Sequence, residues 1–307
     1  MTEPNPAATR SPRPPLSVTI STVQGWPEIA ANLRTVIDSV SDIGGEVVVT
    51  DGSGNQVPQS DEVGPGVVWL SYPGESVFQL RDRGYKAAGG EIVAITEDHV
   101  RVPPDWARKI LDAHAAHPEA TAIGGSVENA ATGNAMDWGS FLVVQAAVAA
   151  PIQSGPAKRL SGAVNVAYKR HAIEAMETYG GLGAMDGLHQ RHLAATGATL
   201  LSDDTIRVLH DQSLGFRGTT AIHYNAGRTM SGFKRQHMDA VQWLRVIGAP
   251  IIPLARFARA VALLTPRGYG PQIARSGPAM LWLLYSQGVG QFVGYLAGPG
   301  DSPGKVQ

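Results

Sequence analysis

The chain has 307 residues, no cysteine and a formal net charge of −1. The absence of cysteine excludes disulfides, thiolate metal sites and cysteine nucleophiles, and the length suffices for one large domain or two smaller ones. Residues 1–15 are rich in Pro, Ser, Thr and Asn and contain no apolar run. We therefore expect a disordered tail rather than a signal peptide, and a cytoplasmic protein.

The first third of the chain alternates apolar runs with helical patterns. Residues 27–40 and 78–88 carry apolar side chains at helical spacing, which predicts two helices. Short apolar runs typical of buried strands lie around them, at 16–20, 46–50, 67–70 and 92–96. Strands that alternate with helices predict an α/β protein with a doubly wound, mostly parallel sheet flanked by helices.

The middle of the chain continues the alternation less regularly. We expect two late strands at 199–201 and 206–209, and a link of high glycine content at 180–183. Further helices are predicted at 106–117, 141–150, 170–176 and 186–195, and further strands at 122–127 and 161–168. The alternation predicts one domain over residues 16–218.

Residues 219–307 form a predicted amphipathic helical extension. Two long apolar segments, 247–264 and 278–296, lie within it. The second contains Gln287, Gln291 and several glycines, so we expect it to pack on protein or lie in the plane of a membrane rather than cross one. Residues 205–307 hold 11 Lys and Arg against 3 Asp and Glu. Such a basic region could face substrate phosphates, contact an anionic membrane peripherally, or form ordinary solvated helices.

Three polar residues, Glu97, Asp98 and His99, directly follow the predicted strand at 92–96. Open α/β sheets bind their ligands at the carboxyl ends of the strands. Carboxylates and imidazole bind divalent cations, and a cation at this position indicates a phosphate-bearing substrate. The alternative is an acidic cap on the helix that follows.

Several fragments occur in an order typical of one enzyme family. Thr50-Asp51-Gly52-Ser53 ends a strand as Asp-Asp-Gly-Ser does, and Arg81-Asp82-Arg83-Gly84 is similar to an Ala-Arg-Asn-x-Gly helix. Gly180-Gly181-Leu182 before Asp186 is similar to a Gly-Gly-Phe segment before Glu-Asp, with Met185 in place of the glutamate. Glu97-Asp98-His99 falls where that family has its DxD motif. Residues 16–235 thereby resemble the family 2 glycosyltransferases, which have the GT-A fold.

The resemblance implies a metal-dependent, inverting glycosyltransferase that uses a nucleotide-sugar donor. Asp186 would be the general base, with His189 and His192 of the same predicted helix as alternatives. The residues implied in nucleotide-sugar binding are Thr22, Asp51, Arg81, Glu97 and Asp98. The implied metal ligands are Glu97, His99 and His210, which would hold Mn²⁺ or Mg²⁺, and the imidazoles favour Mn²⁺.

The acceptor implied by the resemblance is a saccharide, a lipid-linked molecule or a small molecule, and no nucleic-acid partner is expected. A role in cell-envelope polysaccharide or glycoconjugate synthesis would follow, at the inner face of the membrane if the basic helices contact it. The departures at Thr50, Met185 and His99 leave open a non-catalytic nucleotide-sugar-binding protein. A nucleotidyltransferase is disfavoured, because residues 21–28 contain one glycine and no Lys or Arg to hold a triphosphate.

Overall fold

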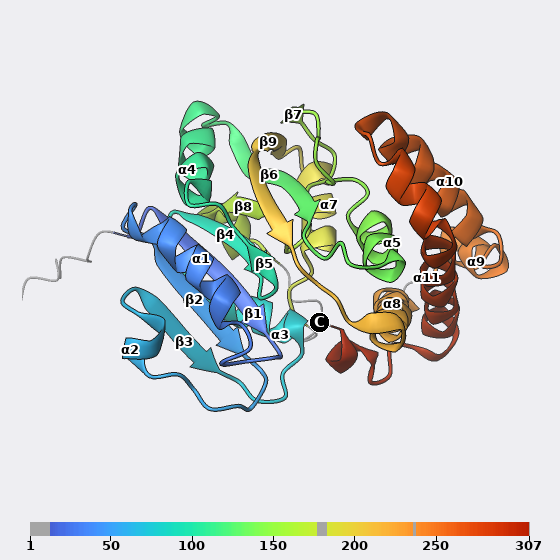
Figure 1. Ribbon diagram of the computed structural model, residues 1–307, viewed down its shortest axis with the longest axis horizontal. Coiled ribbons are helices and arrows are strands. Elements are labelled where there is room, and N and C mark those ends of the chain that lie inside the picture. The colour runs from blue at the N-terminus through green and yellow to red at the C-terminus, as the bar shows by residue number, and fades with distance from the viewer. Residues whose placement is uncertain (1–12, 177–182, 236–237, 307) are drawn as a thin grey trace, which may run out of the picture.

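A nine-stranded mixed sheet forms the centre of the computed structural model, which describes residues 13–176, 183–235 and 238–306 (Figure 1). The strands are β1 Leu16–Thr22, β2 Glu46–Asp51, β3 Val67–Ser71, β4 Ile92–Glu97, β5 Val100–Arg101, β6 Ala120–Asn129, β7 Gly155–Pro156, β8 Val166–Lys169 and β9 Thr199–His210. Their spatial order is β3-β2-β1-β4-β8-β6-β9-β5, and β7 pairs with β9.

The first four strands run parallel, as their alternation with helices predicted. β1 pairs with β2 and β4, and β2 pairs with β3, all in parallel register. The switch of chain direction on either side of β1 is that of a doubly wound sheet. The carboxyl ends of β1, β2 and β4 therefore meet at one edge, where Thr22, Asp51 and Glu97 lie.

Helices cover both faces of this sheet, and alternate residues of β4 pack against different layers. Ala94 belongs to the apolar core that includes α1 Ala30–Ser41, α4 Trp106–Ala116 and α5 Ala135–Val144. Val93 and Ile95 belong to the core beneath α3 Val77–Ala87, α6 Arg170–Glu174 and α7 Asp186–Ala195. Burial on both faces explains why the strands read as continuous apolar runs. A short helix, α2 Ser60–Val63, precedes β3.

The second half of the sheet is mixed. β8 pairs antiparallel with β4 and β6, while β6 and β9 run parallel. The two late strands expected at 199–201 and 206–209 are one continuous strand, β9, whose register against β6 shifts between Asp203 and Arg207. The Asn165 amide fills this irregularity by donating to the carbonyls of Ser126 (2.9 Å) and Ile206 (2.8 Å).

Two predicted elements have different limits in the structure. The helix expected at 141–150 is α5, which begins at Ala135 because the Asn134 side chain caps it by accepting from the backbone N–H groups of Met136 and Asp137. The strand expected at 161–168 begins only at Val166. The preceding residues form a loop that Ser161 closes by donating to the Asn165 carbonyl at 2.5 Å.

The C-terminal region is a helical layer beside α5, drawn in orange to red in Figure 1. Its helices are α8 Gly215–Gly232, α9 Ala240–Ile247, α10 Ile252–Leu264 and α11 Gly270–Ala297, with the 3-10 turns η2 Thr265–Arg267 and η3 Ser302–Lys305. Glycines let α11 approach α8 closely: a Cβ on Gly290 would lie 2.0 Å from the Tyr224 carbonyl oxygen. None of the helices in the described parts of the chain combines the length and the apolar character needed to cross a membrane.

Candidate functional site

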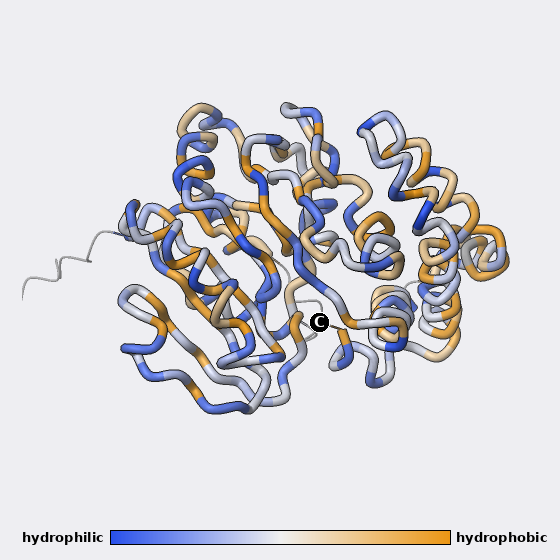
Figure 2. Tube along the Cα trace, in the orientation of Figure 1, coloured by the Kyte–Doolittle hydropathy of each residue, from blue (hydrophilic) through white to orange (hydrophobic). Residues whose placement is uncertain are grey.

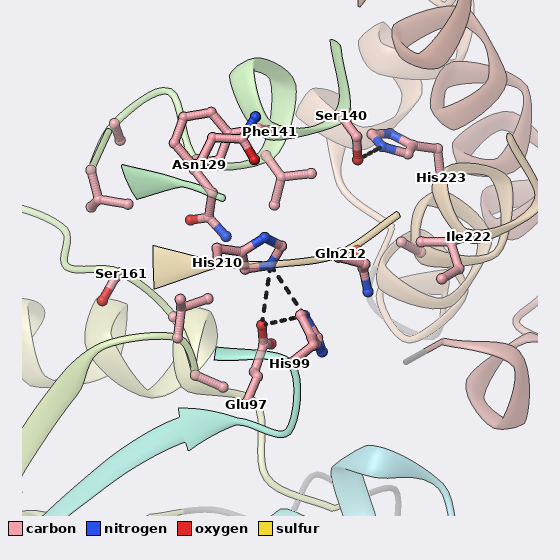
Figure 3. Close-up of a pocket in the computed structure, with 18 of the residues that line it drawn as sticks. Glu97, His99, Asn129, Ser140, Phe141, Ser161, His210, Gln212, Ile222 and His223 are labelled. Atoms are coloured by element: carbon pink, nitrogen blue, oxygen red, sulfur yellow. Dashed lines mark hydrogen bonds and ion pairs between the residues drawn. The ribbon is translucent and has the colours of Figure 1, made fainter. Parts of the chain in front are cut away.

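Glu97, His99 and His210 converge at the carboxyl edge of the sheet (Figure 3). Glu97 ends β4, His99 lies in the turn that follows, and His210 ends β9. The pairing of β5 with β9 sets Val100 opposite His210 and thereby brings His99 beside it. His99 Nε2 lies 3.1 Å from His210 Nε2 and 3.3 Å from Glu97 Oε2, and His210 Nε2 lies 3.7 Å from the same carboxylate oxygen.

Asp98 lies behind this cluster rather than in it. Its Oδ1 is 2.7 Å from His99 Nδ1, and its Oδ2 accepts from the Thr22 hydroxyl at 2.6 Å. Asp98 is 8% exposed and Thr22 is fully buried. The Thr22 hydroxyl also accepts from the backbone N–H groups of Gln24 and Gly25. The polar atoms of both side chains are thus engaged within the protein, and Asp98 fixes the ring that presents Nε2 to the cluster.

The charged forms of Glu97 and His99 are both stabilised in the cluster. Burial disfavours the Glu97 carboxylate, but the hydrogen bonds from His210 and His99 outweigh burial and hold the pKa of Glu97 well below its usual range. Burial also disfavours charged His99, yet the Asp98 and Glu97 carboxylates outweigh it and raise the pKa of His99 to about 10. Two carboxylates therefore stabilise positive charge at this imidazole.

The three facing atoms fit a shared divalent cation. Ligand atoms about 2.1 Å from an octahedral ion lie about 3.0 Å apart, and the observed separations of 3.1, 3.3 and 3.7 Å are close to that value. One carboxylate with two imidazoles suits a transition metal better than Mg²⁺, which prefers oxygen ligands. The hydrogen bond that His99 Nδ1 donates to Asp98 supplies the outer-shell partner usual for a metal-bound histidine.

Arg81 joins the metal-ligand cluster to Asp186. Its guanidinium donates to Glu97 Oε1 at 3.1 Å and lies 4.0 Å from Asp186 Oδ2. Asp186 begins α7, is 3% exposed, and accepts from the Tyr85 hydroxyl at 3.0 Å. Burial raises the pKa of Asp186, and the charge of Arg81 opposes that rise. Asp186 is therefore a buried carboxylate with increased proton affinity, one side chain away from Glu97.

Asp51 lies at the end of β2, beside the end of β1. It is fully buried, and its Oδ1 accepts from the Ser53 backbone N–H at 2.8 Å. Its Oδ2 has no hydrogen-bond partner among the described residues. A buried carboxylate oxygen without a partner is costly, so a donor from a ligand would stabilise it. The neighbouring Thr50 pairs with the Ser21 hydroxyl at 3.0 Å.

A cavity of about 280 Å³ extends from the cluster towards α5 and α8. Arg81, Glu97, His99 and His210 line one part of it, whereas Thr22, Asp51, Asp98 and Asp186 do not line it. Figure 3 shows Ser140 and His223 at the opposite side from Glu97. Of the residues predicted from the sequence, four therefore line the cavity and four lie outside its lining.

The cavity wall contains polar residues that the sequence analysis missed. Asp137 of α5 accepts from Asn134 and Ser213 through Oδ2, while its buried Oδ1 has no partner among the described residues. His223 of α8 lies 3.0 Å from the Ser140 hydroxyl, and burial, then the charge of Arg256, lowers its pKa to about 4. None of the fragments that carry the resemblance includes Asp137 or His223.

The alternative bases lie away from the cavity. His189 is 1% exposed and packs against the Tyr168 ring with 5.6 Å between ring centroids, and His192 is exposed near the end of α7. Met185, which replaces the glutamate of the motif, is buried with Val77 and Phe78. The Gly180-Gly181-Leu182 segment lies outside the described residues.

Comparison with known proteins identifies the architecture. No protein-family model and no curated protein matches the sequence. Among solved structures, the chain resembles the mannosyltransferase PcManGT from Pyrobaculum calidifontis in complex with GDP-Man and Mn²⁺. The TM-score is 0.55 and the identity 18%, over 92% of this chain and 88% of that chain. The fold is that of a GT-A glycosyltransferase. The fold class expected from the sequence is confirmed, and at this identity the likeness establishes the fold alone.

Proposed function

We propose that this GT-A protein is a metal-dependent glycosyltransferase that moves a sugar from a nucleotide-sugar donor to an acceptor hydroxyl. The observation that carries the proposal is the cluster of Glu97, His99 and His210 at the carboxyl edge of the sheet, open to a cavity. PcManGT, which shares the fold, binds GDP-Man and Mn²⁺. The family 2 assignment, suggested by the ordered motifs, is part of this proposal.

The donor would lie across the strand ends. Glu97, His99 and His210 would hold Mn²⁺, with Mg²⁺ less suited to two imidazoles. When bound, the ion supplies Lewis-acid stabilisation of the departing diphosphate. Arg81 adds a positive charge beside Glu97. The unpartnered oxygen of Asp51 suits an N–H of the nucleotide base. Because the polar atoms of Thr22 and Asp98 are engaged internally, we assign these two residues to positioning rather than to donor contact.

Transfer would be a single inverting displacement. The acceptor oxygen forms a bond to the anomeric carbon while the bond from that carbon to the diphosphate oxygen breaks, and the acceptor proton passes to a carboxylate. We propose Asp186 as this base, because burial raises its proton affinity and Arg81 connects it to Glu97. Asp137 is the second carboxylate to test, because it lines the cavity with one unpaired oxygen.

Thermal-shift screening with UDP-, GDP- and dTDP-sugars, with and without Mn²⁺, tests donor binding. We expect a Mn²⁺-dependent rise in melting temperature with one nucleotide, and loss of that rise in His99→Ala. His117→Ala is the matched control, since the exposed His117 lies near the end of α4 and pairs with Glu119. An unchanged Mn²⁺-dependent shift in His99→Ala would refute the metal assignment.

Turnover separates the enzyme from the alternative of a non-catalytic binding protein. If the protein is an enzyme, it should hydrolyse the bound nucleotide sugar slowly, or transfer its sugar to an acceptor, when Mn²⁺ is present. Binding without release of nucleoside diphosphate, in the presence of saccharide and lipid-linked acceptors, would favour the non-catalytic alternative. We retain as proposals a cytoplasmic site of action, peripheral membrane contact through the C-terminal helices, and a role in cell-envelope glycoconjugate synthesis.

A further inference from the structure

A second cavity, of about 340 Å³, adjoins the first where α10 and α11 meet the end of α5. The two cavities share four lining residues, Val144, Ala147, Arg159 and Gln287. The second cavity, which we call the arginine groove, is additionally lined by Arg256 and Arg259 of α10. Arg159 therefore lines both the metal-site cavity and the arginine groove.

The three arginines of the groove have no counterion within the described part of the chain. None of their side chains forms a hydrogen bond or an ion pair with any residue that the structure describes, and no Asp or Glu lines the groove. Arg159, Arg256 and Arg259 line the same cavity, so their like charges lie near one another. Burial, then the charge of Arg159, lowers the pKa of the half-buried Arg256. Clustered guanidinium groups without acidic partners would be stabilised by an anionic ligand.

The remaining lining is apolar. It consists of Val143, Val144, Ala146, Ala147, Ala260, Leu263 and Leu284 beside the arginines and the Gln287 amide. In the same helical layer, Leu244 and Ile247 of α9 and Ile251 before α10 are 66%, 76% and 69% exposed. Figure 2 shows hydrophobic residues along α9 and α10, interrupted on α10 by hydrophilic ones. The groove thus combines cationic groups with an apolar lining.

We propose that the arginine groove binds a phosphate or diphosphate group carried by the acceptor. This inference rests on the proposed glycosyltransferase function, in which the donor diphosphate is held at Glu97, His99 and His210. The shared wall at Arg159 would set an acceptor anchored in the groove beside the donor sugar. Guanidinium groups match phosphate oxygens in a bidentate manner. The apolar lining fits a phosphate ester on a hydrocarbon chain, although a soluble sugar phosphate offers the same anionic group.

Calorimetric titration of the full chain in EDTA tests the groove without the metal site. The probes are inorganic pyrophosphate, octyl phosphate and the neutral octyl glucoside. We expect octyl phosphate to bind the wild-type protein, and each of Arg256→Gln and Arg259→Gln to raise its Kd about tenfold. Arg275→Gln is the matched control, because Arg275 is an exposed α11 residue outside both cavities.

The three probes distinguish the sources of the anion. Arginine-dependent binding of octyl phosphate alone supports a lipid-borne phosphate, and comparable binding of pyrophosphate supports a soluble phosphorylated acceptor. Octyl phosphate affinity that is unchanged in the Arg256 and Arg259 variants, or matched by octyl glucoside, overturns the proposal.

The donor screen, repeated on the two arginine variants, separates this inference from the proposed function. Mn²⁺-dependent nucleotide binding that is unchanged in the two variants supports an acceptor site in the groove. A loss of nucleotide binding in both variants would assign the groove to the donor and would overturn this inference. Phosphate binding in a protein that binds no nucleotide sugar would refute the proposed function while leaving an anion site.

Discussion

Asp98 provides a direct test of how the metal-ligand cluster is built. In Asp98→Asn, the side chain keeps its size and an oxygen that can accept from His99 Nδ1, but it loses its charge. A hydrogen bond to a charged group contributes about 1.5–3 kcal/mol and a neutral one about 0.5–1.5 kcal/mol. The loss is therefore about 1–1.5 kcal/mol at this buried 2.7 Å contact, or roughly tenfold in Mn²⁺ affinity once each Kd is corrected for the proton that competes for His99. That value lies at the lower end of the 10- to 100-fold range typical of outer-shell partners.

The substitution also disturbs the other side of Asp98. The Thr22 hydroxyl donates to Asp98 and already accepts from the backbone N–H groups of Gln24 and Gly25, so it has no free lone pair for an asparagine amide. Thr22→Val separates this effect from the first, because it removes the hydroxyl and leaves the Asp98 charge beside His99. We expect Thr22→Val to lower the melting temperature and to change Mn²⁺ affinity by less than about threefold.

Electron paramagnetic resonance measures free Mn²⁺ during titration of the full chain and gives the Kd of each variant directly. The melting temperature of each variant, measured without metal, shows whether the chain has folded. If the folded Asp98→Asn protein had a Kd for Mn²⁺ within twofold of the wild-type value, Asp98 would neither orient His99 nor strengthen metal binding through its negative charge. Equal weakening by Thr22→Val would show that the effect reflects general disruption of the strand ends.

Three further predictions concern the base, the core and pH. Asp186→Asn should preserve donor binding and lower transfer at least about 100-fold, and near-normal turnover would exclude it as base and direct the test to Asp137→Asn. Asn165→Ala should lower the free energy of unfolding, measured in urea, by about 3 kcal/mol or more, because two carbonyls and the Trp106 indole N–H lose a buried partner. A decrease below about 1 kcal/mol would contradict this. Burial lowers the pKa of His114 to about 4, so only the unfolded chain takes up this proton as pH falls through 6.5. The His114 contribution to stability should therefore fall by about 2 kcal/mol between pH 7 and pH 5, so the pH dependence of His114→Phe should differ from that of the wild type by this amount.

The sequence predicted the parallel half of the sheet better than the mixed half. The strands β1, β2 and β4 are buried on both faces, so each is a continuous apolar run with a polar residue at its end. β9 was predicted as two strands because its centre, Ser202 to Thr205, is polar. In the structure this stretch bulges away from β6, and the Asn165 amide satisfies the carbonyls there. That compensation comes from a distant residue, which local periodicity cannot show.

The part of the candidate site formed by polar residues at strand ends could be predicted from the sequence. Glu97 and His99 are polar residues directly after a buried strand, and His210 likewise ends a strand, so their meeting follows from strand pairing. Asp137, His223 and the arginine groove were not predicted, because α5, α8 and α10 come together only through tertiary packing. The excess of basic residues in 205–307 was compatible with substrate phosphates, an anionic membrane or ordinary solvated helices, and it did not show which arginines would lack acidic neighbours.

The histidine at position 99 changes the electrostatics of the motif less than the sequence suggests. Where the resembling motif ends in a carboxylate, an imidazole leaves one negative charge fewer among the direct ligands. The Asp98 carboxylate, 2.7 Å from the far side of the same ring, retains a negative charge behind it. Asp98 and His99 thus act as one unit, in which the imidazole contributes ligand geometry and the carboxylate contributes charge. The double variant Asp98→Asn/His99→Ala should accordingly bind Mn²⁺ no more weakly than His99→Ala alone, since the charge acts through the ring.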